Sequence, residues 1–302
     1  EGVRLCHCAG PDMMYIEDTG NHDVRTEGMS YAMMFCVQMN RQKEFDCLWR
    51  WVVTHMYLTE GENAGYFAWS CHTDGSKNSD GPAPDGEEFF AMSLFFAANR
   101  WGSGEGVLDY ASWARRILHA CVHKGEEAGS GFPMWNPENH LIKFIPNCEF
   151  TDPSYHLPHF YELFALWSDE CDRPFWHAAA AASRQYLRKA CHARTGLSAE
   201  YAEYDGRPHR GDQPDRHDWF FSDAYRTLGN IALDAQWFGD KDGWAQETAA
   251  HIQQFFEEKE HGQTNGIYLI DGTPVEGNAL HPVGLLATIA QGSLILDDAC
   301  AD

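Results

Sequence analysis

The sequence lacks any long hydrophobic run, and no apolar stretch approaches the roughly 18 residues needed to span a bilayer. Basic residues are also scarce, with 22 Lys and Arg against 45 Asp and Glu and a formal net charge of −23. Because such a chain repels phosphate groups, neither nucleic acid nor an anionic membrane surface is expected as a partner. A neutral or cationic small molecule fits the composition better.

Recognisable cofactor and metal motifs are missing as well. There is no Cys-x-x-Cys pair, and Gly102-x-Gly-x-Gly106 follows a helical pattern, which is the wrong context for phosphate binding. His119 and His123 are four residues apart on one expected helix but lack the intervening Glu of a zinc protease. We interpret these histidines as structural or exposed, and we predict no cofactor and no metal.

Ten cysteines are spread along the chain, several of them inside apolar stretches such as those around Cys36 and Cys47. In such surroundings cysteine usually acts as a small hydrophobic residue. The pattern predicts reduced thiols and a cytoplasmic location. No basic-then-apolar leader opens the sequence at Glu1.

Apolar residues recur at helical spacing in nine segments separated by loops rich in Gly, Pro and Asp. Strand signals are few and short, the best being Gly65–Trp69. The pattern predicts a single all-α domain over residues 1–302, built from stacked helical hairpins. The expected helices are 29–40, 44–57, 88–101, 109–123, 154–167, 173–191, 219–238, 244–259 and 282–297.

Glu27 stands where a polar loop runs into a long apolar helix, with Thr26 as a plausible N-cap. Burial raises the pKa of a carboxyl group and a helix N-terminus lowers it, so a second nearby acid is expected if Glu27 is to be a catalytic acid. The alternative is that Glu27 only complements the helix dipole.

Two further acids are candidates for the second carboxylate. Asp85 lies between a Pro-stiffened turn and the expected helix 88–101, where it could equally be an N-cap. Asp223 and Arg226 are three residues apart on one helical face, so the guanidinium can keep that carboxylate ionised as a base. The alternative for this pair is an ordinary ion pair on a solvated face.

Several aromatic residues occur in loops, where flat rings can stack on the apolar face of a sugar. Ordinary packing of loops against helix ends is the alternative. Three acids beside such loops favour glycoside hydrolysis, in which one acid protonates the leaving oxygen and a base activates water. The loop aromatics are Tyr66, Phe67, Trp69, Phe132, Trp135, Tyr155 and Trp219.

Long motifs over nearly the whole chain resemble glycoside hydrolase family 8, and within it the reducing-end xylose-releasing exo-oligoxylanases. The resemblance implies an (α/α)6 barrel, an inverting mechanism and xylooligosaccharide substrates shortened by one xylose at the reducing end. Nine helices are expected here against the twelve of a closed ring, so either terminal helices lie outside this sequence or the barrel is incomplete. The matching segments are 21–38, 65–69, 82–101, 151–165 and 217–238.

The resemblance also implies roles for particular residues. Glu27 in Thr-Glu-Gly-Met-Ser-Tyr matches the general acid of the family, and Asp223 matches its general base. Asp85 matches the aspartate that binds and distorts the sugar at the cleavage point, and Tyr155 matches a tyrosine that helps to hold the attacking water.

The expected substrate-binding set consists of Trp69, Trp135, Arg226 and His281. Leu280-His281-Pro282 resembles a loop that closes the far end of the cleft in exo-acting members, with His281 reaching the reducing-end hydroxyl. A cleft that is closed after one product subsite excludes leaving groups longer than one sugar, and so favours exo action. The alternatives are an endo-acting family 8 xylanase, β-glucanase or chitosanase, and an inactive carbohydrate-binding homologue.

Overall fold

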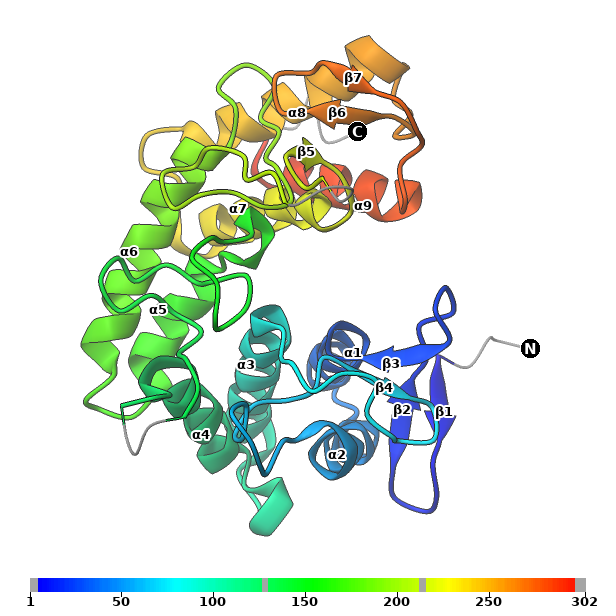
Figure 1. Cartoon of the computed structure of the whole chain (residues 1–302), viewed down its shortest axis with the longest axis vertical. Coiled ribbons are helices and arrows are strands. Elements are labelled where there is room, and N and C mark those ends of the chain that lie inside the picture. Colours follow the sequence, from blue (N-terminus) through cyan, green and yellow to red (C-terminus); the bar gives the residue numbers. More distant parts are fainter. Residues whose placement is uncertain (1–4, 127–129, 212–215, 297–302) are drawn as a thin grey trace. The chain divides into compact units, whose positions relative to one another are not determined.

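The regular structure of the chain consists mainly of α-helices, which are joined by long loops (Figure 1). The computed structural model describes residues 5–126, 130–211 and 216–296. Across these ranges there are nine α-helices, and no strand exceeds three residues. The all-α prediction and the expectation of few, short strands are therefore confirmed.

Two compact units divide the chain, and neither is a single continuous stretch. Unit 1 comprises Glu1–Trp135, Ile145–Asn147 and Phe164–Arg173, whereas unit 2 comprises Asn136–Phe144, Cys148–Leu163 and Pro174–Asp302. The chain therefore passes between the units several times. A single catalytic domain over residues 1–302 stays a prediction.

In unit 1, helix α1 packs on α2 and α3, and α3 packs on α4 (Figure 1). Two antiparallel strand pairs, β1–β2 and β3–β4, flank these helices. The elements are β1 Cys6–Cys8, β2 Met14–Ile16, β3 Asp23–Arg25, α1 Thr26–Gln38, α2 Gln42–Trp51, a π-helical turn Val52–Met56, β4 Ser70–His72, α3 Pro84–Trp101, a 3-10 turn Gly106–Leu108 and α4 Tyr110–His123.

Fully buried aromatic rings form the centre of unit 1. Trp49 lies between Phe67, Phe90 and Trp113, with ring centroids 5.5–5.9 Å from its own. The indole nitrogen of Trp49 donates to the backbone oxygen of Val107 at 2.8 Å, so its polar atom is satisfied. Burial of such large rings is the main stabilising contribution to this core.

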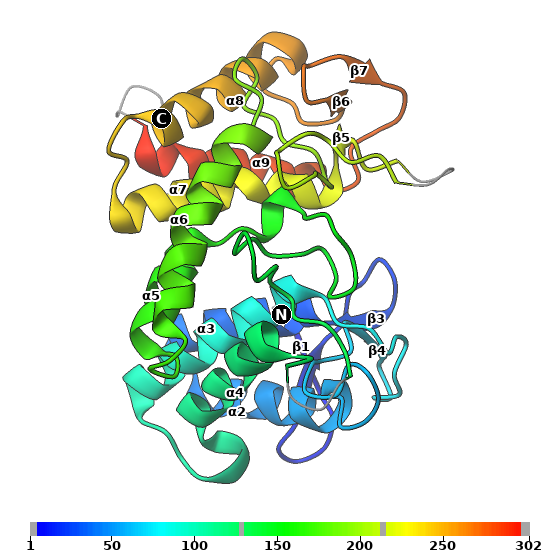
Figure 2. The same ribbon diagram turned by 60° about the vertical axis from the view of Figure 1, so that its left-hand side comes forward.

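In unit 2, helices α7, α8 and α9 pack against one another, as both views show (Figures 1 and 2). A three-stranded antiparallel sheet in the order β5-β6-β7 flanks them. Helix α5, Pro158–Trp167, begins in unit 2 and ends in unit 1. The other elements are a 3-10 turn Pro153–Tyr155, α6 Arg173–Ala190, β5 Trp219–Phe220, a 3-10 turn Ser222–Tyr225, α7 Arg226–Phe238, α8 Trp244–Glu260, β6 Ile267–Leu269, β7 Pro274–Val275, α9 Pro282–Gly292 and a 3-10 turn Ser293–Ile295.

All nine expected helices are found, but three of them begin four or more residues from the predicted start, and α2 and α9 end at Trp51 and Gly292 rather than at 57 and 297. Helix α3 begins at Pro84 rather than 88, because proline is well suited to the first helical turn. Helix α5 begins at Pro158 rather than 154. Helix α7 begins at Arg226 rather than 219, because Trp219 pairs with Leu269 in the sheet and so adopts extended backbone.

None of the helices that the structure describes combines the length and the apolar character needed to cross a membrane. The nine cysteines of the described ranges are free thiols, and four of them, Cys47, Cys71, Cys121 and Cys191, are buried. Cys300 lies outside the described residues.

Candidate active site

Glu27 is the second residue of α1 and is half-buried. The N-cap of this helix is Arg25, so the prediction that Thr26 is the N-cap is wrong. Thr26 is instead the first helical residue, and its backbone N–H donates to the oxygen of Trp69 at 3.0 Å. Its buried hydroxyl donates to the Glu27 carboxylate at 3.4 Å. The partner strand β4, rather than a side-chain cap, therefore positions the start of α1.

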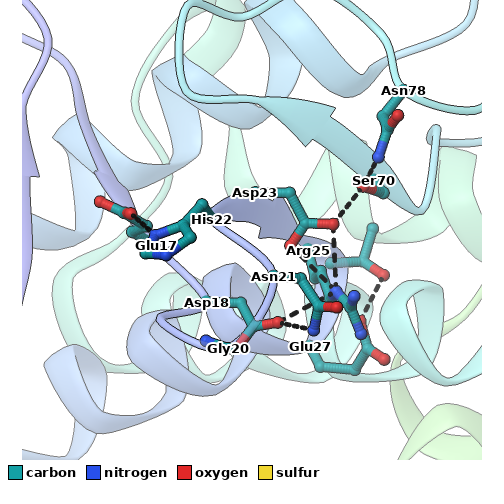
Figure 3. A network of polar contacts seen from close by, with 11 residues as sticks. Glu17, Asp18, Gly20, Asn21, His22, Asp23, Arg25, Glu27, Ser70 and Asn78 are labelled. Atoms are coloured by element: carbon teal, nitrogen blue, oxygen red, sulfur yellow. Dashed lines mark hydrogen bonds and ion pairs between the residues drawn. The ribbon is translucent and has the colours of Figure 1, made fainter.

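The loop that leads into Glu27 is held by a network of charged and polar groups (Figure 3). Arg25 Nε donates to Asp23 at 3.0 Å and lies 3.5 Å from Asp18. Buried Asp23 also accepts a hydrogen bond from Ser70 at 2.9 Å. These contacts join β3 to β4 and fix the backbone immediately before Glu27.

Helix α3 brings a second carboxylate to the start of α1. A Cβ atom on Gly86 would lie 2.5 Å from the Thr26 Cβ, so glycine is needed for the two helix beginnings to approach. Asp85 is buried in the first turn of α3 and accepts a hydrogen bond from the Gly86 backbone N–H at 3.0 Å. The alternative that Asp85 is an N-cap is wrong, since that position is occupied by Ala83.

Glu87 is a carboxyl group that the sequence analysis missed. Burial, together with the negative charges of Asp85 and Glu27, raises the pKa of Glu87 well above its usual range. One of its oxygens accepts a hydrogen bond from the Phe67 backbone N–H at 3.0 Å. Burial therefore favours the protonated, uncharged form of Glu87 beside the other two acids.

The loop aromatics differ in their exposure. Tyr66 and Phe67 are buried in the core of unit 1, so the expectation that they line a wet groove is wrong. Trp69 is half-buried and stacks under the Arg25 guanidinium, whose carbon lies 5.1 Å from the ring centroid. Trp135 is 1% exposed, and its role in substrate binding stays a prediction.

In unit 2, Asp223 lies in a 3-10 turn directly before α7, and 42% of its side chain is exposed. Arg226 Nη2 lies 3.6 Å from its carboxylate and also donates to Ser154 Oγ at 3.1 Å. The preceding residue, Ser222, has φ of +43°, a costly conformation for a residue other than glycine. The predicted pairing of Asp223 with Arg226 is therefore present, in a strained turn rather than on a regular helix.

Two buried carboxyl groups near Asp223 were also missed. Burial and the charge of Asp223 raise the pKa of Asp152 well above its usual range, although Arg226 opposes this shift. Burial and the charge of Asp223 likewise raise the pKa of Glu200 to about 8. Glu200 also accepts a hydrogen bond from the Trp219 indole at 2.6 Å. Asp223 thus has two neighbouring acids whose protonated forms are favoured by burial.

Tyr155 and His281 also belong to unit 2. Tyr155 is buried in the 3-10 turn Pro153–Tyr155, and the Arg226 guanidinium lies over its ring at 5.5 Å from the centroid. His281 is exposed at the N-cap position of α9, which packs on the turn that carries Asp223.

The predicted site residues thus form two groups. Glu27, Asp85 and Trp69 come together in unit 1, while Asp223, Arg226 and Tyr155 come together in unit 2. The missed acid Glu87 lies two residues after Asp85, and Asp152 lies three residues before Tyr155. That proximity to predicted site residues was the available signal. Glu200, by contrast, carries no local sign of burial beside Asp223.

The model of the glycosyl hydrolases family 8 matches residues 11–292. The chain therefore belongs to glycoside hydrolase family 8. Members of this family and the structural neighbours of the chain are (α/α)6 barrels, so the predicted fold class is confirmed.

Among its relatives, the chain is 59% identical over 293 residues to the reducing end xylose-releasing exo-oligoxylanase of Halalkalibacterium halodurans. The aligned region covers 97% of this chain and 74% of that protein. It is 58% identical over 282 residues to the enzyme of the same name from Bifidobacterium adolescentis, covering 93% and 73%. The solved structure of the Paenibacillus barcinonensis enzyme complexed with xylose matches with a TM-score of 0.95 and 55% identity, covering 100% of this chain and 79% of that one.

Proposed function

We propose that this chain is an inverting glycoside hydrolase that releases xylose from the reducing end of xylooligosaccharides. The main support is its 59% identity, over 97% of the chain, to an enzyme that is named for this activity. A further relative, from Paenibacillus barcinonensis, has been solved with xylose and, as a variant, with an arabinofuranosyl-xylotetraose. The acidic composition agrees with a neutral sugar as the substrate.

In this proposal Glu27 protonates the glycosidic oxygen. Two further acids, Asp85 and Glu87, lie close to Glu27 at the beginning of α3. Asp85 orients the sugar ring at the cleavage point, and Trp69 offers an aromatic face near the start of α1.

Asp223 acts as the general base that removes a proton from the attacking water. Its exposed carboxylate can reach solvent, and Arg226 Nη2 lies 3.6 Å from it. Tyr155 and Arg226 help to hold the water and the sugar. His281, exposed beside the turn of Asp223, is assigned to the reducing-end hydroxyl.

The first experiment compares Glu27→Gln and Asp223→Asn with the native chain in the hydrolysis of xylotriose. Each substitution removes one acid–base function and should lower kcat by about 10²–10⁴-fold. Matched controls are Glu17→Gln, in the loop before Glu27, and Asp218→Asn, which removes the Asp218–Arg216 ion pair near Asp223. Both controls should keep kcat within a few fold, and a loss of less than tenfold in either test variant would contradict its role.

Product analysis on xylotriose labelled at its reducing end tests the direction of attack. We expect labelled xylose and unlabelled xylobiose, with the new reducing end formed first in the anomeric form opposite to that of the cleaved bond. A ladder of products from longer xylooligosaccharides would indicate endo action. Binding without hydrolysis would indicate a carbohydrate-binding homologue instead.

We also propose a cytoplasmic location. The support is the set of free thiols in the described ranges, four of them buried among apolar side chains. Localisation of the tagged full chain by cell fractionation tests the proposal, and recovery outside the cytoplasmic fraction would contradict it.

A further inference from the structure

Helix α4 presents two histidines to a buried aspartate from a distant part of the sequence. His119 and His123 are one helical turn apart, with ring centroids separated by 4.6 Å. Asp172, in the turn just before α6, is only 4% exposed and faces both rings. All three residues belong to unit 1.

The donor atoms of the three side chains converge on one point. His123 Nε2 lies 2.8 Å from one oxygen of Asp172, and His119 Nδ1 lies 3.8 Å from the other. One donor atom from each residue lies within 4.8 Å of the other two. Since Zn²⁺ takes imidazole and carboxylate donors at about 2.0–2.2 Å, small side-chain rotations would bring all three into its coordination shell.

Glu126 provides an outer partner of the kind that metal sites use. Its carboxylate lies 2.8 Å from His123 Nδ1, the ring nitrogen that points away from Asp172. A carboxylate at that position fixes the ring orientation and leaves Nε2 free of its proton for a metal. Half of the His119 side chain is exposed, so an ion can enter from solvent.

We propose that His119, His123 and Asp172 form a binding site for a divalent cation of the Zn²⁺ class, with Glu126 as the outer partner. Two imidazoles and one carboxylate favour Zn²⁺ over Mg²⁺ or Ca²⁺, which prefer oxygen donors alone. Water would complete the coordination. The ion would join the end of α4 to the turn before α6 and so stabilise unit 1.

The competing interpretation is an ion pair that needs no metal. A protonated His123 between Asp172 and Glu126 would hold the same two segments together. The two interpretations differ in one respect: only the metal site makes stability depend on the concentration of Zn²⁺.

The experiment titrates the metal-free full chain with ZnCl₂ by calorimetry and measures Tm with Zn²⁺ and with EDTA. We expect one ion per chain, and a Tm that rises with Zn²⁺ concentration. His119→Ala and His123→Gln should each weaken binding at least about tenfold, the loss caused by removing even an outer partner. With EDTA present, the His119→Ala variant should keep the native Tm, because the side chain that it removes is half exposed.

The matched control is His22→Ala. Glu17 lies 3.0 Å from His22 and 3.7 Å from His7 of β1, so these three residues are a second group of two histidines and one carboxylate, outside the converging group. Zn²⁺ affinity should not change in this variant. A native chain whose Tm does not respond to Zn²⁺, or an equal loss of affinity in His22→Ala, would overturn the proposal.

The exposed thiol of Cys171, next to Asp172, is the remaining competitor for the ion. Cys171→Ser should retain Zn²⁺ binding, and the Co²⁺-loaded chain should show no thiolate-to-cobalt charge-transfer band. Loss of binding in Cys171→Ser would assign the ion to the thiol and overturn the proposed donor set.

Discussion

Beside each candidate catalytic carboxylate lie buried acids whose pKa values are raised by burial and by nearby negative charge. Glu87 lies beside Glu27 and Asp85, and Asp152 and Glu200 lie beside Asp223. A neutral acid can donate a hydrogen bond without adding a second negative charge. At the scale of single residues, each candidate is therefore surrounded by acids with raised pKa values, and no sequence motif identified these acids.

Glu200 makes this effect measurable. In the unfolded chain its carboxyl loses its proton near the ordinary value of 4.5, whereas in the folded chain burial and Asp223 hold the pKa at about 8. The stability that protonated Glu200 contributes is fully present at a pH below its pKa in the unfolded chain. It is lost as the pH rises from 4.5 to about 8.

Glu200→Gln removes this titration. We expect the Tm of the native chain, relative to that of the Gln variant, to decrease steadily through that pH window. The measurement is thermal unfolding followed by circular dichroism at several pH values. A Tm difference that stays constant across the window would contradict the raised pKa.

At the scale of elements, the beginnings of α1 and α3 are joined by a glycine contact. Gly86 allows Thr26 to pack against the first turn of α3, and this contact brings Asp85 and Glu87 towards Glu27. The strand pair β3–β4 sets the other side of the same helix start. Local propensity thus forms each helix, while close approach of their ends assembles the acids.

Gly86→Ala tests this contact. The new Cβ would lie 2.5 Å from the Cβ of buried Thr26, so one helix start must shift. We expect a loss of about 1–3 kcal/mol in the free energy of unfolding, typical of overpacking, together with reduced kcat. Urea denaturation and xylotriose kinetics measure the two effects.

The control is Gly28→Ala, two residues after Thr26 in α1. Its Cβ would lie 3.4 Å from Ile16, an ordinary contact, and alanine favours the helix by up to about 1 kcal/mol. This variant should be neutral or slightly more stable. Equal destabilisation by both substitutions would rule out a specific role for the Gly86–Thr26 contact.

At the scale of the whole molecule, charge and thiols are distributed properties. The net charge of −23 disfavours polyanionic partners and is compatible with a neutral oligosaccharide. The chain spans about three quarters of the length of the relatives that it matches. Its cysteines occur in both units, so their reactivity reports on burial throughout the molecule.

Thiol reactivity gives a prediction at this scale. Burial raises the pKa of Cys71 to about 11, and it is the largest cause that raises the pKa of Cys36 and of Cys191 to about 12. At neutral pH these three thiols therefore form little of the nucleophilic thiolate. In the native chain, an aromatic disulfide reagent should react fast with exposed Cys8 and Cys171 and slowly with those three.

After denaturation without reductant, all ten thiols should react. Mass spectrometry of the labelled peptides identifies the sites and the order of reaction. Fewer than ten labelled cysteines in the denatured chain would contradict the reduced state.

The sequence alone was sufficient to place nine helices, because apolar periodicity and Gly or Pro at helix ends are local properties of the chain. It was also sufficient to propose Glu27, Asp85 and Asp223 as site candidates, because their surrounding motifs resemble those of the family to which the chain belongs. Only the tertiary structure decided that α7 begins after a strand, since β5 exists through its pairing with β6. It also placed Asp172 against His123, 49 residues earlier, and buried Glu200 beside Asp223. Burial and long-range contact arise when distant segments pack together, and no local pattern encodes them.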